Sequence, residues 1–198
     1  LMSLPTINYL TELNQKISFP DFLKNIGSNL QQRENIYTQF TERLLTMENI
    51  GSYLFNILMI AIIPAIGEEL IFRGVLQKLF TEVFENVHLS ILITAILFSA
   101  VHGQFFGFIP RFVLGILLGY IMIWSKSIWL PVLCHFFNNA LAITAYYLFN
   151  KGVIKISPDL LGIENGFTFI LPISIVLTAL LIYFLRKTLK ADYEIANS

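Results

Sequence analysis

The sequence predicts an all-α fold, a polytopic bundle of transmembrane helices preceded by an amphipathic or interfacial helical segment. Of the 198 residues, 56% are hydrophobic and only 13% are charged, whereas an average soluble domain has roughly 25% charged residues. The apolar residues gather in runs that approach the ~20 residues needed to cross a bilayer. Because these runs lack the period-two alternation of a membrane β-barrel, we expect helices, whose backbone groups pair within each segment.

Charge and cysteine content exclude other classes of protein. Thirteen basic and thirteen acidic residues cancel, so nothing favours binding to nucleic acid. The single cysteine, Cys134, excludes an intramolecular disulfide framework and a cysteine-rich metal site. We expect a multi-pass membrane protein surrounded by lipid bilayer, and the short chain, rich in Ile, Asn and Phe, favours the bacterial cytoplasmic membrane. The sequence begins at Leu1 and not at Met, so we also expect a longer parent chain.

Residues 1–50 are expected to form a polar N-terminal helical segment at the membrane surface. Turn-forming residues at 19–21 and 27–28 punctuate this segment. Apolar residues then recur at helical spacing, at Ile36, Tyr37, Phe40, Leu44 and Met47. This spacing predicts a helix between Ser28 and Met47 that lies on the bilayer or packs beside the first span. A solvated helical linker is the alternative.

Residues 51–190 are expected to form the transmembrane core, and residues 191–198 a polar tail. The first span is one long helix over about 52–80, with charged residues part-way along. Four further spans are predicted at about 89–106, 109–124, 129–149 and 167–186. Gly115 and Gly119 lie four residues apart and predict close helix packing inside the bundle. The oligomeric state is left open.

Charged and imidazole side chains inside apolar spans are costly and therefore indicate function. The candidates are Glu68, Glu69, Arg73, His102, Arg111, His135 and Asn139. Glu69 and Arg73 share a helix face and can pair, whereas Glu68 is rotated from Glu69 by about 100°. One carboxylate can therefore be neutralised while the other faces a cavity, where it suits a general base. Arg111 is expected at the membrane interface.

The histidines extend this interpretation to two more spans. His102 shares a face with Phe98, and His135 shares a face with Asn139. A paired imidazole and amide can donate hydrogen bonds to one oxyanion. Two carboxylates, two imidazoles and an amide therefore predict a water-activating site. The structural alternatives are an interfacial Glu–Arg pair, a buried histidine bonded to backbone, and interhelical hydrogen bonds worth ~1 kcal/mol.

Three motifs make the sequence resemble a known family. They read Glu68-Glu69-x-x-x-Arg73, Phe98-x-x-x-His102 and His135-x-x-x-Asn139, in that order. This pattern, over about residues 50–150, resembles the CPBP family of intramembrane proteases. That family includes the type II CAAX prenyl endopeptidases and bacteriocin-processing or immunity proteins. The resemblance implies an intramembrane endopeptidase that hydrolyses a peptide bond of a membrane-associated or lipid-modified protein or peptide.

The resemblance also implies roles for the motif residues. Glu68 would be the general base that activates water, with help from His102, and Glu69 would either assist or be held by Arg73. His135 and Asn139 would stabilise the oxyanion. No His-Glu-x-x-His pair occurs on one helix. We therefore expect no cofactor, although a divalent metal such as zinc, held by two histidines and a glutamate, stays an alternative.

Two other functions stay open at this point. Intramembrane glutamate and histidine side chains also form proton relays, so a proton-coupled transporter or channel is one alternative. Internal repeats would support it, and none is found. The other alternative is a catalytically silent membrane scaffold or a bacteriocin-immunity protein with the same fold.

Overall fold

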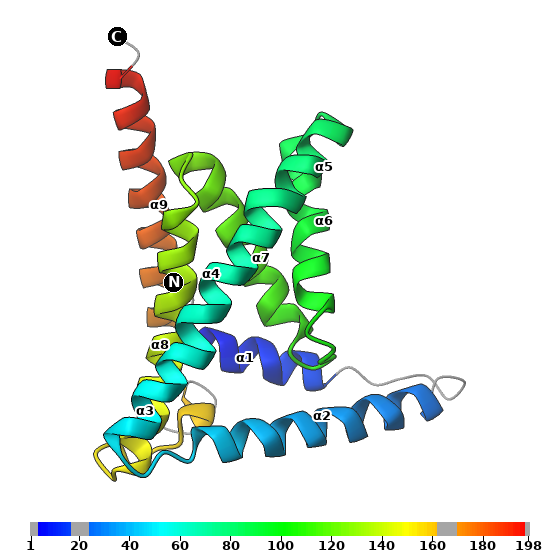
Figure 1. Cartoon of the computed structure of the whole chain (residues 1–198), viewed down its shortest axis with the longest axis vertical. Helices are drawn as coiled ribbons and strands as arrows, with labels where there is room; N and C mark the ends of the chain where they lie inside the picture. The colour runs from blue at the N-terminus through cyan, green and yellow to red at the C-terminus, as the bar shows by residue number, and fades with distance from the viewer. Residues whose placement is uncertain (1–3, 17–23, 162–169, 197–198) are drawn as a thin grey trace.

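The fold is known from a computed structural model, which describes residues 4–16, 24–161 and 170–196 (Figure 1). Throughout these ranges the regular elements are helices. They are α1 (Leu4–Gln15), α2 (Lys24–Leu45), α3 (Ile50–Asn56), η2 (Ile57–Ile62), α4 (Ile63–Glu69), η3 (Leu70–Leu76), α5 (Gln77–Phe84), α6 (Val87–Ala100), α7 (Phe108–Ser125), α8 (Trp129–Asn150), η4 (Pro158–Leu160) and α9 (Ile170–Ala196). The predicted all-α class is confirmed.

Four stretches in the described ranges are long and apolar enough to cross a membrane, so the chain is a multi-pass membrane protein. They are Ile50–Phe84, Phe108–Ser125, Trp129–Asn150 and Ile170–Thr188. The remaining predicted span, 89–106, is the shorter helix α6 of 14 residues. It ends earlier than predicted, and Gly103 in the following turn has a left-handed φ of 67°.

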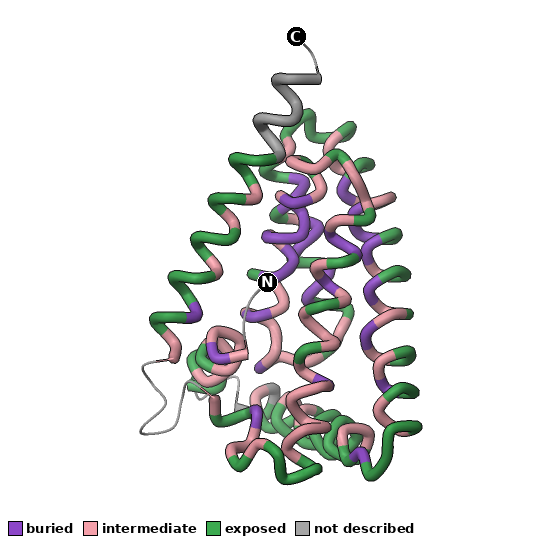
Figure 2. The backbone as a smooth tube through the Cα atoms, turned by 90° about the vertical axis from the view of Figure 1, so that its left-hand side faces the viewer, coloured by how far each residue is buried: buried purple, intermediate pink, exposed green. Residues whose placement is uncertain are grey.

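The outer surface of the bundle is apolar and the interior is partly polar. Only 6% of the apolar window of α9, Ile170–Thr188, is buried, and Figure 2 shows exposed and half-buried residues along most of this stretch. An exposed apolar face of this kind suits contact with lipid. Glu69, Arg73 and Gln77, by contrast, are at most 2% exposed. These three polar side chains of the long first span therefore face the other helices.

The first span runs continuously from Ile50 to Phe84 and crosses the bundle obliquely (Figure 1). A capping box between Asn49 and Ser52 begins it. Two wide π-helical segments, η2 and η3, flank the short α-helix α4. Glu68 and Glu69 are the last residues of α4, between these segments. Such π-helical turns occur frequently at functional sites.

Helices α1 and α2 lie across one end of the bundle (Figure 1). α2 confirms the helix predicted between Ser28 and Met47, but residues 27–28 lie inside it and do not interrupt it. The predicted turn at 19–21 lies outside the described residues. α1 is bound to the core, because the side chain of Asn14 is 2% exposed and donates to the carbonyl of Phe105.

Close packing between α6 and α7 agrees with the interpretation of Gly115 and Gly119. A Cβ atom on Gly115 would lie 3.0 Å from the Cβ of Ala95, and one on Gly119 would lie 2.9 Å from Ile91 Cγ2. Both glycines thus serve packing inside the bundle. Their backbone carbonyls also accept hydrogen bonds from the first span, at 2.9 Å from Arg73 Nη2 and 3.1 Å from Gln77 Nε2.

Candidate active site

A buried ion pair between Glu69 and Arg73 forms the inner wall of the site. Arg73 Nε lies 3.1 Å from Glu69 Oε2, and Arg73 Nη1 lies 3.1 Å from Glu69 Oε1. Both side chains are 0% exposed. The guanidinium also lies over the Phe98 ring, 4.7 Å from its centroid. Two contacts between the same carboxylate and guanidinium fix the orientation of both groups. Each charge compensates the other in a protein interior from which water is excluded.

His135 joins this pair to the side of the site that faces the cavity. Its Nδ1 lies 2.9 Å from Glu69 Oε1. Because the carboxylate paired with Arg73 can only accept hydrogen bonds, the proton of His135 is on Nδ1. The other ring nitrogen, Nε2, then faces Glu68 at 3.9 Å. Glu69 therefore fixes both the orientation and the tautomer of His135.

His102 approaches Glu68 from the turn that follows α6, with its ring held in a similar way. Its Nδ1 lies 2.8 Å from the carbonyl oxygen of Phe98, one turn earlier. A carbonyl only accepts, so Nδ1 is again the donor and Nε2 faces Glu68. The separation of His102 Nε2 and Glu68 Oε2 is 3.9 Å. Glu68 Oε2 is buried and has no hydrogen-bond partner among the described residues.

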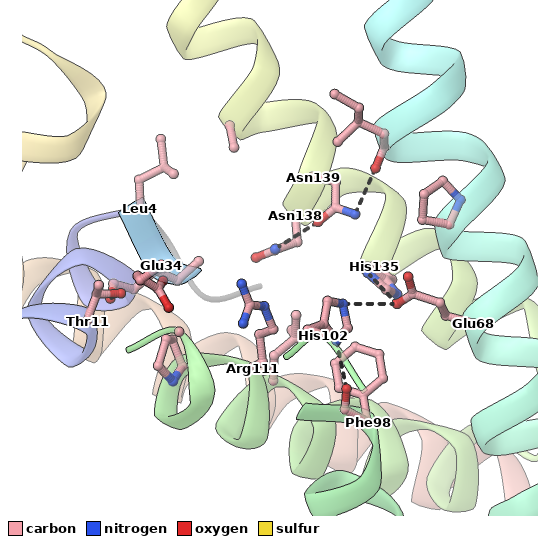
Figure 3. A pocket seen from close by; sticks show the side chains of 17 residues that line it. Leu4, Thr11, Glu34, Glu68, Phe98, His102, Arg111, His135, Asn138 and Asn139 are labelled. Carbon is pink, nitrogen blue, oxygen red and sulfur yellow. Dashed lines mark hydrogen bonds and ion pairs between the residues drawn. The ribbon is translucent and has the colours of Figure 1, made fainter. Parts of the chain in front are cut away.

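These groups open onto a cavity of about 480 Å³ (Figure 3). Its polar lining includes Glu68, His102, His135 and Asn139. Its apolar lining comes from several helices and includes residues of α1, such as Leu4 and Ile7. A water molecule and a peptide segment could therefore reach Glu68 from one side, while Glu69 stays sealed on the other. The cavity combines convergent polar groups with apolar walls, as ligand sites commonly do.

The structure brings Glu68, Glu69, Arg73, His102 and His135 into one cluster. Asn139 lies on the wall of the same cavity, and its Nδ2 donates to the carbonyl of Ile60 at 3.2 Å (Figure 3). Ile60 belongs to the π-helical segment η2. One N–H of the amide is thus used by the neighbouring helix, which leaves the second N–H for the cavity.

Two further residues, Arg111 and Asn138, line the cavity. The position of Arg111 at the membrane interface stays a prediction, and its Nη1 is buried in the cavity wall. Asn138, which the motif passes over, lines the cavity beside Asn139. Spacing alone does not identify them, because each depends on how α7 and α8 are turned in the bundle. The charge of Arg111 within an apolar run was the available signal.

The donor set does not fit a metal ion as it stands. No group of three or more His, Cys, Asp or Glu side chains within the described ranges is arranged to hold one. Glu68 Oε2 lies 3.9 Å from each of the two ring nitrogens, whereas two ligands of a tetrahedral zinc ion with bonds of about 2.1 Å lie roughly 3.4 Å apart. The chemistry proposed below therefore uses side chains alone.

Comparison with known proteins agrees with the motifs. Residues 50–141 match the family described as type II CAAX prenyl endopeptidase Rce1-like. A protein of Escherichia coli described as an uncharacterized 24.3 kDa protein is 30% identical over 100 residues, which are 48% of this chain and 46% of that protein. The match thus spans about half of that relative's length. No solved structure matches the chain. The resemblance recognised from the three motifs is confirmed by this family match over residues 50–141, which carry every predicted site residue.

Proposed function

We propose that this chain is an intramembrane endopeptidase. It hydrolyses a peptide bond of a membrane-associated or lipid-modified protein or peptide, using water activated by Glu68. One observation carries the proposal: Glu68 Oε2 is buried in the cavity wall, faces two imidazole Nε2 atoms at 3.9 Å, and has no hydrogen-bond partner in the described part of the chain. The match to a protease family supports it.

The first step is deprotonation of water. Glu68 accepts the proton, and the resulting hydroxide attacks the carbonyl carbon of the substrate. His102 assists, because its Nε2 faces Glu68 and its Nδ1–H is occupied by the carbonyl of Phe98. The proton then passes from Glu68 to the amine that leaves when the carbon–nitrogen bond breaks. Glu68 returns to its carboxylate form, and the proton count balances.

Oxyanion stabilisation falls to His135 and Asn139 in this mechanism. Because the Nδ1–H of His135 is already donated to Glu69, donation to the oxyanion uses the imidazolium form of His135, with a second proton on Nε2. In that state both ring nitrogens donate, Nδ1 to Glu69 and Nε2 to the oxyanion. The second N–H of Asn139 completes the pair of donors. Donors held in advance in a site without bulk water are the largest single contribution in many hydrolases.

We further propose where the chain acts. Residues 51–190 form the protease core in the bacterial cytoplasmic membrane, and residues 191–198 form a polar tail. Residues 1–50 lie at the membrane surface. Ile36 and Phe40 on α2 are 61% and 62% exposed, which favours contact between this helix and the lipid surface. The partners are a peptide or protein substrate and lipid, with no nucleic acid.

The test compares peptide termini in cells that express the wild type or Glu68→Gln. We expect specific new termini in the wild-type cells, and a reduction of at least ~100-fold with Glu68→Gln, the lower end for loss of a general base. Glu82→Gln is the matched control, because Glu82 is exposed on the same long helix. All three proteins must accumulate to the same level in the membrane fraction.

The other functions predict different results. If the termini match between wild type and Glu68→Gln in the native host, the proposed mechanism is wrong. A phenotype that survives joint substitution of Glu68 and His102 would support the scaffold or immunity alternative. Proton flux in proteoliposomes that depends on Glu68, without proteolysis, would support the transporter.

A further inference from the structure

The cavity contains two buried polar atoms that the proposed mechanism does not use. Arg111 Nη1 and Asn138 Oδ1 both lack a hydrogen-bond partner among the residues that the structure describes. Both side chains line the cavity that holds Glu68. Buried polar groups are nearly always paired, so two unpaired groups on one cavity wall call for an explanation. One is a donor and the other is an acceptor.

Two neighbouring residues, Gln104 and Gly107, hold the Arg111 side chain in place. Its Nη2 donates to Gln104 Oε1. The guanidinium lies against Gly107, where a Cβ atom would stand 2.5 Å from Nη1. A side chain at position 107 would therefore displace it. Figure 3 shows Arg111 beside His102, with its guanidinium directed toward Asn138. The fold thus fixes this cation while its Nη1 stays without a partner.

Asn138 is held in a similar way on α8. Its Nδ2 donates to Asn139 Oδ1 at 3.3 Å, which leaves Oδ1 as an acceptor in the cavity. Asn139 in turn donates to the carbonyl of Ile60. The two neighbouring amides therefore form a short chain anchored on the first span. This chain orients the acceptor of Asn138 toward whatever occupies the cavity.

A donor and an acceptor on the wall of one cavity match the backbone of an extended peptide. In a β-strand, the N–H and the C=O of one residue point to the same side. A carboxylate fits less well, because Glu34 and Glu68 also line the cavity and would repel it, and Asn138 Oδ1 offers it no donor. Resting on the proposed function, we infer that Arg111 and Asn138 position the substrate. Arg111 Nη1 donates to the carbonyl of one extended residue, and Asn138 Oδ1 accepts from the N–H of the same residue.

The test uses a peptide that the wild type cleaves and Glu68→Gln does not. Each backbone N–H of that peptide is replaced in turn by an N-methyl group, and kcat and KM are measured with purified protein in lipid nanodiscs. We expect one position near the scissile bond to raise KM about 10-fold in the wild type. Asn138→Ala should raise KM for the unmodified peptide and should abolish the extra effect of N-methylation at that position.

Arg111 is tested through the same KM readout. Arg111→Leu should raise KM about 10-fold or more with a smaller change in kcat, and Arg111→Lys should recover part of the loss because it keeps a donor. The matched controls are Arg43→Leu and Asn150→Ala, since Arg43 is exposed on α2 and Asn150 bonds to Leu45 outside the cavity. These controls should leave KM unchanged.

Three outcomes would overturn the inference. In the first, the N-methyl effect is equal in the wild type and Asn138→Ala, or no position shows an effect. In the second, Arg111→Leu lowers only thermal stability or kcat, which identifies a structural role. In the third, Arg111→Leu selectively affects peptides with a free C-terminal carboxylate or an acidic side chain, compared with amidated or glutamine versions, which identifies a carboxylate site. Absence of any Glu68-dependent cleavage would instead refute the proposed function.

Discussion

Glu68 and Glu69 are adjacent in sequence, yet they lie in opposite environments. Glu69 is 0% exposed and its oxygens meet Arg73 and His135 at 2.9–3.1 Å. The side chain of Glu68 is 29% exposed, and its nearest charged or imidazole groups are 3.9 Å away. The partners of the Glu69 carboxylate are therefore other side chains of the protein. Near Glu68, by contrast, the cavity wall includes buried polar atoms without a hydrogen-bond partner among the described residues, namely Glu68 Oε2, Arg111 Nη1 and Asn138 Oδ1.

This difference assigns different roles to the two glutamates: Glu69 contributes to the stability of the fold, and Glu68 contributes to the proposed catalysis. A carboxylate whose lone pairs are already occupied is a poor base, whereas one without donors can take a proton from water. The 100° rotation between neighbouring helix positions is enough to place the two glutamates on different sides of the first span. Substitutions on the Glu69 side should therefore change folding, and those on the Glu68 side should change activity.

The largest effect on stability is expected from Arg73→Met. It leaves the Glu69 carboxylate buried without its main partner, which should lower the free energy of unfolding by about 3–5 kcal/mol. Adding Glu69→Gln should recover part of the loss, because the uncompensated charge is then gone. Unfolding can be followed in an SDS titration by thiol labelling of Cys134, the single cysteine, which is half-buried in α8.

Glu68→Gln is the matched comparison in the same titration. Its free energy of unfolding should stay within about 1 kcal/mol of the wild type, since no hydrogen bond to Glu68 Oε2 is lost. Equal destabilisation by Glu68→Gln and Arg73→Met would contradict the proposal that Glu69 serves stability while Glu68 serves catalysis.

The next largest effect on stability is expected from His135→Phe, and it should exceed the effect of His102→Phe. His135→Phe removes a donor to the buried Glu69 carboxylate and should cost about 2–3 kcal/mol of stability. His102→Phe removes only a hydrogen bond to the backbone carbonyl of Phe98 and should cost less than about 1 kcal/mol. Both variants should lose ~100-fold or more in proteolytic rate. Equal stability of the two variants, measured through Cys134, would contradict the role of His135 as the link between the sides.

How far the sequence predicts this site depends on the kind of signal. Charged side chains inside apolar runs identified Glu68, Glu69 and Arg73, because burial of charge is costly wherever it occurs. Helical spacing also predicted the Glu69–Arg73 pair. The link between His135 and Glu69 spans 66 residues, and no local periodicity encodes it. The cavity wall formed by α1 was missed for the same reason, since residues 1–50 carry a surface-like composition.

A smaller effect tests the packing that brings α7 to the first span. Gly119→Ala places a Cβ atom 2.9 Å from Ile91 Cγ2 and 3.0 Å from Gln77 Oε1, so it should cost about 1–2 kcal/mol of stability through overpacking. Gly67→Ala is the control, because nothing lies within 4 Å of its added Cβ. In a helix this change should be neutral or stabilising by up to about 1 kcal/mol. Similar losses for both would show that packing at Gly119 is not the cause.

The smallest effect is expected from metal removal, which tests the Glu68 side directly. Glu68 Oε2 and His102 Nε2 are acceptor atoms that face one region, and Nε2 of neutral His135 adds a third, so this region can bind either water or a metal ion. Their 3.9 Å separations exceed the roughly 3.4 Å between ligands of tetrahedral zinc. Cleavage of the identified peptide should therefore stay within about twofold after dialysis against 1,10-phenanthroline, since Glu68, assisted by His102, activates the water without a metal ion. Inhibition that zinc reverses, and that disappears in His102→Phe, would mean that the two imidazoles and Glu68 close around a metal ion. The Glu69 side would keep its role in either case, because its oxygens are already occupied by Arg73 and His135.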